Sequence, residues 1–153
     1  MKRTPLKRGT KRLKRSGFKK RVKSKTTKKY LAKSAKSWKK KAWEKFSELV
    51  RRKAEGRCYI CGAQNDWRDC HASHFRHGRL DLDPRNVKCS CRHCNLFLHG
   101  NLGEYALRLI EEYGIDGITR LNQDATRELG APKKSVEDYK KLYNDFVEEL
   151  KLL

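Results

Sequence analysis

Two pairs of cysteines in the middle of the chain have the spacing of metal ligands. Cys58 and Cys61 form one Cys-x-x-Cys pair, Cys91 and Cys94 form the other, and twenty-nine residues separate them. The two thiolates of such a pair can both turn toward one ion, and two pairs complete the tetrahedral four-sulfur shell that zinc prefers. The sequence therefore predicts a structural zinc site that closes the intervening chain into a loop.

Two polar residues near these cysteines could carry out hydrolysis. His74 ends a short run of extended pattern inside the loop, and Asn95 directly follows the fourth cysteine. A histidine of near-neutral pKa can activate water, and an amide oxygen suits Mg²⁺ or Mn²⁺, which neutralises charge on a phosphate. This pair predicts phosphodiester hydrolysis; the alternative is that His74 is an ordinary surface or supporting histidine.

Positive charge is concentrated at the N-terminus. Of the 39 Lys and Arg residues, 20 lie in the first 41 positions, where Asp and Glu are absent, so the remainder has a net charge of only +1. Such a segment cannot bury enough apolar surface to offset its ordering entropy, and we expect residues 1–33 to be a disordered basic arm. The arm predicts DNA as partner, with a solubilising or targeting tail as the alternative. The expected phosphate contacts are Lys2, Arg3, Lys7, Arg8, Lys11, Arg12, Lys14 and Arg15.

The remaining composition predicts a cytoplasmic protein. The chain has no apolar run near eighteen residues and no apolar signal core, so we expect no membrane span. Four of six cysteines follow the paired pattern, which favours metal binding in a reducing compartment over disulfides. Cys70 and Cys89 are left over, and we expect buried thiols there.

Apolar periodicity predicts an α+β fold that is mostly helical. Apolar residues at helical steps favour a helix packing on the module over 34–56, with Gly56 as its stop. We expect Trp38 and Trp43 on this helix to pack in the core, with base stacking as the alternative. Two strands are expected over 66–75 and 85–89, then helices over 91–99, 102–113, 115–121 and 135–150, with capping boxes at Asn101 and Ser135.

These elements divide the chain into four expected parts. They are the arm at 1–33, the helix at 34–56, a zinc-knuckle module at 57–101 and a helical C-terminal support at 102–153. Two strands and a helix pinned by zinc form a unit too small to fold without the metal.

Several short motifs agree in type and order with a known family. They are Ala72-Ser-His74-Phe-Arg76, Asn86, Cys91-Arg-His-Cys94-Asn95, Gly100-Asn101, Tyr105, and Ile110 through Gly114. Over residues 38–125 the chain resembles the phage NinG (Rap) recombination endonucleases, within the ββα-metal (HNH or His-Me finger) nucleases. The resemblance implies a zinc-pinned ββα-metal finger flanked by helices.

By this resemblance His74 is the general base, Asn86 orients it, and Asn95 binds the catalytic Mg²⁺ or Mn²⁺. Many HNH enzymes have Asp immediately before the base, where this chain has Ser73. The missing ligand could be His99, which its spacing of four places on the same helix face as Asn95, or His71, or waters and substrate phosphates. Arg76, Arg79, Arg85 and Arg92 are expected to contact phosphates, with ordinary surface charge as the alternative.

The resulting hypothesis is a metal-dependent, structure-selective endonuclease that cuts branched recombination intermediates such as Holliday junctions and flaps. If phage-encoded, it would act in the host bacterial cytoplasm. A symmetric cut of a junction would require a homodimer. The alternatives are a non-catalytic zinc module that binds nucleic acid, and a homing-type or defence HNH nuclease with another DNA target.

Overall fold

The computed structural model describes residues 35–130 and 133–153. The element order is α2 (Ala35–Lys53), β1 (His71–His74), β2 (Val87–Ser90), η1 (His93–Phe97), α3 (Leu102–Gly130) and α4 (Val136–Lys151). The expectation of a mostly helical fold with a small sheet is confirmed. The predicted arm at 1–33 lies outside the described residues, and so do its eight expected phosphate contacts.

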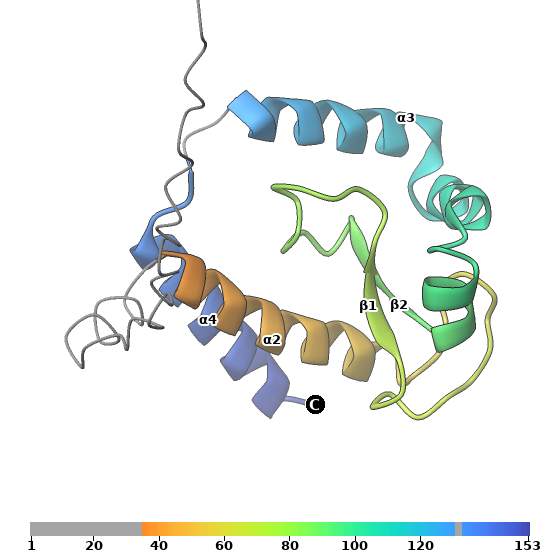
Figure 1. The fold of residues 1–153 in the computed structure, drawn as a ribbon, viewed down its shortest axis with the longest axis horizontal. Helices are drawn as coiled ribbons and strands as arrows, with labels where there is room; N and C mark the ends of the chain where they lie inside the picture. The colour runs from red at the N-terminus through yellow and green to blue at the C-terminus, as the bar shows by residue number, and fades with distance from the viewer. Residues whose placement is uncertain (1–34, 131–132) are drawn as a thin grey trace, which may run out of the picture.

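Helices α2 and α4 lie side by side (Figure 1). Phe46 of α2 is buried and packs against Phe146 of α4, with ring centroids 4.9 Å apart. Trp38 meets Tyr143 edge to face at 5.8 Å, as its predicted packing role requires. The predicted capping box at the start of α4 is present, because Ser135 and Asp138 each accept a backbone N–H from the other. Long-range aromatic contacts thus join the two ends of the described chain.

The two strands pair antiparallel but are shorter than predicted. His71 lies opposite Ser90, and His74 lies opposite Val87. The chain from Asp66 to Asp69 forms a turn, in which the Asp66 carboxylate accepts the Arg68 N–H at 2.8 Å. Aspartate side chains compete with the sheet for backbone N–H groups in this way, which explains why the first strand begins only at His71.

The helix after the cysteines is also shorter than predicted. It is a five-residue π-helix ending at Phe97, because the chain then turns and the Gly100 N–H donates back to the Cys94 and Asn95 carbonyls. His99 and Asn101 have positive φ values of 49° and 43°. An N-cap residue has extended backbone, so the predicted capping box at Asn101 is wrong.

Helix α3 bends at Gly114, which has φ 72° and ψ 171°. The expected stop at this glycine is therefore confirmed, but the second helix runs to Gly130 instead of ending near Leu121. Its extra length carries Asn122 and Asp124 to the loop between the strands, where they contact Arg76 and Arg85.

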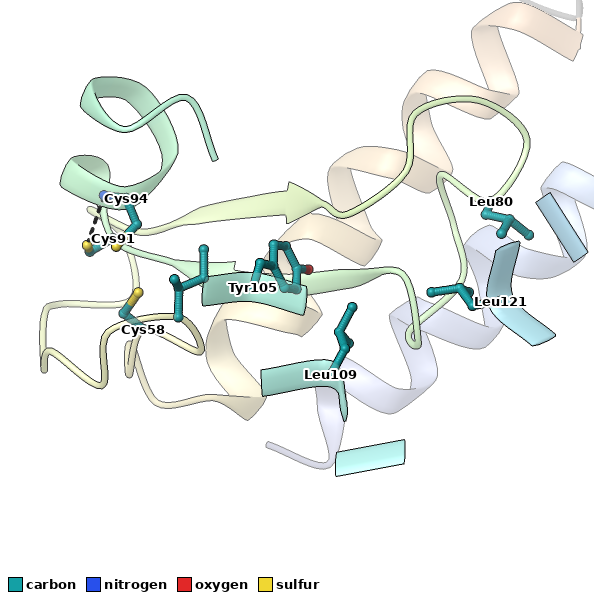
Figure 2. Close-up of a cluster of buried hydrophobic side chains, with 8 residues drawn as sticks. Cys58, Leu80, Cys91, Cys94, Tyr105, Leu109 and Leu121 are labelled. Atoms are coloured by element: carbon teal, nitrogen blue, oxygen red, sulfur yellow. Dashed lines mark hydrogen bonds between the residues drawn. The ribbon is translucent and has the colours of Figure 1, made fainter. Parts of the chain in front are cut away.

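Tyr105 occupies the centre of the core on the first half of α3. Its side chain is fully buried, and its hydroxyl donates to the Ser73 carbonyl at 3.0 Å. Figure 2 shows Cys58, Cys91 and Cys94 gathered at one end of the strands, while Leu80 and Leu121 meet at the other. One buried cluster thus runs from the cysteines to the loop that follows β1. No described helix is long and apolar enough to cross a membrane.

Gly56 lies where the chain folds back closely on itself before the first cysteine pair. Its φ is 76°, and an added Cβ would lie 2.1 Å from the Asn65 carbonyl oxygen. We expect Gly56→Ala to lower the free energy of unfolding by about 3 kcal/mol, from backbone strain plus overpacking. The control is Gly114→Ala, at φ 72° with nothing within 4 Å, which should cost only about 1 kcal/mol. If denaturant titrations showed equal losses of unfolding free energy in the two variants, the close approach of Gly56 to Asn65 would be contradicted.

Candidate metal centre and active site

The four paired cysteines converge as predicted. Their sulfurs all lie within 4.8 Å of one another, and those of Cys61 and Cys91 are 3.8 Å apart. Tetrahedral zinc with bonds of about 2.3 Å requires sulfurs about 3.8 Å apart, so the donor set fits this ion. Cys58, Cys91 and Cys94 are buried, whereas Cys61 is exposed. The four thiols could therefore hold a metal ion such as zinc.

The thiols of this cluster differ in acidity. Burial raises the pKa of Cys58, but hydrogen bonds from the backbone of Cys61, Cys91 and Ile60 outweigh it and bring the pKa to about 7. Burial raises the pKa of Cys94, and its thiol neighbours raise it further. Backbone N–H groups thus favour one thiolate, and a bound cation would stabilise the others.

The two remaining cysteines are buried thiols, as expected. Cys70 donates its S–H to the Gly56 carbonyl at 3.2 Å. Burial raises the pKa of Cys89 to about 12, so this thiol is neutral at physiological pH. Cys89 lies on β2, and Cys70 directly precedes β1.

His74 lies in a pocket formed with α2. Its ring stacks on Trp43 at 4.6 Å, and its Nε2 lies 3.7 Å from Asp81, which is too far for a hydrogen bond. Asp81 also pairs with Lys39 at 2.6 Å. The pocket is an open hollow of about 340 Å³ lined by Lys36, Lys39, Lys40, Trp43, His74, His77 and Asp81. The stacking of Trp43 on His74 was not predicted, since it joins residues distant in sequence.

Burial lowers the pKa of His74 below its usual 6.5, although the Asp81 carboxylate opposes this shift. The imidazole is 15% exposed, and its Nε2 is buried without a hydrogen-bond partner among the described residues. A neutral imidazole with an uncommitted nitrogen can accept a proton, which is the chemical requirement for a general base.

Asn86 shapes the loop beside His74. It is completely buried, accepts the Arg76 N–H at 2.8 Å, and donates to the carbonyls of Arg76 and Leu80. The bonds recorded for its side chain thus go to the backbone of the loop and not to His74. The loop in turn carries His77 and Asp81 into the pocket.

Asn95 makes its contact with the opposite face of β1. Its Oδ1 accepts the Ser73 hydroxyl at 2.6 Å, and Ser73 in turn contacts the Ser90 hydroxyl. Adjacent strand residues point to opposite faces, so Ser73 and His74 diverge. These oxygens are of the type that Mg²⁺ or Mn²⁺ accepts, but they are neutral. Such a set fits an ion only with further oxygens from water or phosphate.

The two histidines considered as further metal ligands have different positions. His71 is half-buried at the start of β1, on the same strand face as Ser73. His99 is exposed, and it lies beyond the end of η1 at Phe97 with positive φ. The uninterrupted helix that grouped His99 with Asn95 is therefore not present.

The four predicted phosphate-binding arginines are also distinguished by their contacts. Arg85 pairs with Asp83 at 2.7 Å and Asp124 at 3.0 Å, so its guanidinium ties the loop to α3. Arg76 donates to Asn122 at 2.8 Å, also on α3. Arg79 is half-buried and lines the neighbouring hollow with Lys36 and Lys39, and Arg92 is exposed at the start of η1.

The fold and the cysteine cluster define a small, mostly helical protein organised around a candidate metal centre. A family model described as "Bacteriophage Lambda NinG protein" matches residues 1–153, and the chain belongs to this family. No curated protein and no solved structure matches the chain.

The metal site is tested by its cysteines. We expect purified protein to contain about one zinc ion per chain, because four thiolates complete its shell. Cys58→Ser and Cys91→Ser should each lose most of the zinc, measured by elemental analysis. Cys70→Ser is the matched control and should retain it, since Cys70 lies outside the cluster. Full zinc content in Cys91→Ser would contradict the assignment.

The charges around His74 predict opposite pKa shifts. Asp81 raises the pKa of His74 and Lys39 lowers it, so Asp81→Asn should move the pKa down and Lys39→Met should move it up, as measured by NMR titration. Because the folded-state pKa is depressed, the stability contributed by His74 is present above pH 6.5 and is lost as the pH falls through the folded pKa. Shifts of the same sign in both variants would contradict this arrangement.

Proposed function

We propose that this protein is a metal-dependent endonuclease of the HNH type, with residues 57–101 as its catalytic module. The observation that carries the proposal is that His74, whose Nε2 has no hydrogen-bond partner among the described residues, lines a hollow together with three lysines. A nitrogen base beside cations suits a reaction in which water attacks an anionic phosphodiester.

The order and placement of the elements support this class. Two antiparallel strands lead into a short helix, and the cysteine cluster joins the start of the module to that helix. A ββα-metal finger has the same order, with its base on the first strand and a metal ligand on the helix. In this proposal His74 on β1 and Asn95 on η1 would take these roles.

In the proposed mechanism, His74 Nε2 accepts a proton from the attacking water. Trp43 fixes the imidazole plane by stacking, and Asp81 stabilises the imidazolium that forms. Lys36 and Lys40 attract the phosphate, and Asn86 holds the loop that completes the pocket. A Mg²⁺ or Mn²⁺ ion held by Asn95 and Ser73, on the other face of β1, would neutralise charge on the DNA backbone bound there.

The proposed substrate is branched DNA formed during phage recombination, such as Holliday junctions and flaps, in the host bacterial cytoplasm. Family membership supports this substrate class. The basic arm would add sequence-independent affinity by releasing counterions from phosphates. Symmetric cutting of a junction would require two copies of the chain, so a homodimer on DNA is part of the proposal.

The decisive variant is His74→Ala. We expect it to bind zinc and junction DNA as the wild type does, but to cut junctions about 10²- to 10⁴-fold more slowly, which is the usual contribution of a general base. Glu111→Ala is the control and should cut normally, because Glu111 is exposed on α3 and does not line the hollow around His74. Wild-type protein that binds DNA but cuts none, with Mg²⁺ or Mn²⁺ added, would favour a non-catalytic binding module.

Deleting residues 1–30 tests the arm. We expect DNA affinity to fall most at low salt and its dependence on salt concentration to become shallower, because fewer counterions are released. The measurement is a series of binding isotherms at increasing salt on one duplex. An unchanged slope would show that the arm serves a purpose other than DNA binding.

A further inference from the structure

Three consecutive apolar side chains project from the end of η1. Leu96, Phe97 and Leu98 are 48%, 66% and 44% exposed, and we call them the apolar tip. They are the three residues that follow Asn95, and Asn95 directly follows Cys94 of the cysteine cluster. Exposure of three neighbouring apolar residues costs solvation free energy and marks an interaction surface.

The charges around the apolar tip favour a polyanionic partner. From Ser90 to Gly103 the chain contains no Asp or Glu, whereas Arg92, His93 and His99 lie within this segment. Arg92, His93 and His99 are exposed. An apolar segment that is flanked in sequence by a cation and imidazoles complements DNA, whose bases are apolar on their faces and whose backbone is anionic.

The exposed apolar residues of α3 provide the contrast. Leu107, Ile110 and Ile115 are also exposed, but they lie among Glu104, Glu111, Glu112 and Asp116. Carboxylates of this density repel a phosphate backbone, so this part of the surface does not suit DNA. The apolar tip and the α3 residues therefore differ in the partner they can accept.

The apolar tip is also held rigidly. Cys94 immediately before it is buried, the Leu98 N–H donates to the His93 carbonyl at 3.0 Å, and the Gly100 N–H donates to the Cys94 carbonyl at 2.9 Å. The centroids of the His93 and Phe97 rings lie 6.0 Å apart. A fixed backbone lowers the entropy lost when a side chain enters a stack of bases.

We propose that the apolar tip is a wedge that inserts between unstacked bases at a DNA branch point. Bases at a branch are already partly unstacked, so insertion costs less there than in continuous duplex. Phe97 stacks on an exposed base, while Leu96 and Leu98 fill the opened step. The wedge gives the proposed nuclease its preference for branched DNA; it rests on the DNA-binding part of the proposed function and does not require cleavage.

The test uses 2-aminopurine, which brightens when it is unstacked, placed at the branch of a four-way junction or in a matched linear duplex. Full-length protein carries His74→Ala to keep the DNA intact. Binding should brighten the junction probe, and adding Phe97→Ala should abolish most of this signal and weaken junction binding about tenfold, while duplex binding changes less than about twofold. Phe97→Trp should restore both, and Leu107→Ala should change neither.

Each contrary result has a distinct meaning. Junction binding without brightening, or brightening that survives Phe97→Ala, overturns the wedge and leaves the nuclease proposal intact. If Phe97→Ala instead converts a dimer to a monomer in analytical ultracentrifugation without changing the DNA signal, the apolar tip binds a second copy and the wedge is wrong. If the wild-type protein binds no DNA, the proposed function itself fails.

Discussion

The structure depends on the convergence of four thiols from two distant parts of the chain. Cys58 and Cys61 precede the strands, whereas Cys91 and Cys94 follow them, so an ion shared by these sulfurs would close the whole hairpin. The Tyr59 N–H donates to the Cys89 carbonyl at 2.8 Å and supports the same closure. A sheet of two four-residue strands is marginal by itself. Metal binding free energy then becomes folding free energy for this region.

Strand β1 separates two kinds of chemistry. Ser73 faces Asn95 and offers neutral oxygens, while His74 faces α2, where Trp43, Lys39 and Asp81 surround it. The base and the oxygen donors are therefore adjacent in sequence but lie on opposite faces of the strand. No carboxylate contacts Asn95 among the described residues. The negative charge that balances an ion bound there would therefore come mostly from the DNA phosphate. Ion and substrate would bind together in the proposed mechanism.

The sequence predicted those features that depend on local spacing. Cys-x-x-Cys pairs, helical apolar steps, the Gly114 break and the Ser135 cap were all recognisable, because each is determined within a few residues. It did not predict features that depend on contacts across the fold. The first strand is shortened by the Asp66 turn, η1 ends at Phe97 through bonds from the following turn, and Asn86 bonds to the loop backbone. Trp43 was expected in the core, yet only the packing of α2 on the sheet places it against His74.

Hydrogen exchange on the zinc-loaded and zinc-depleted protein would test most directly whether the four thiols hold this fold together. With zinc, the backbone N–H groups of Tyr59 and Phe75 should be protected, since they donate to the Cys89 and Asn86 carbonyls in or beside the hairpin. Removing zinc should abolish this protection, while the paired helices α2 and α4 keep more of theirs through contacts such as Phe46 with Phe146. Zinc added back should restore it. Protection in the hairpin that is unchanged without the metal would contradict the central role of the cysteine cluster.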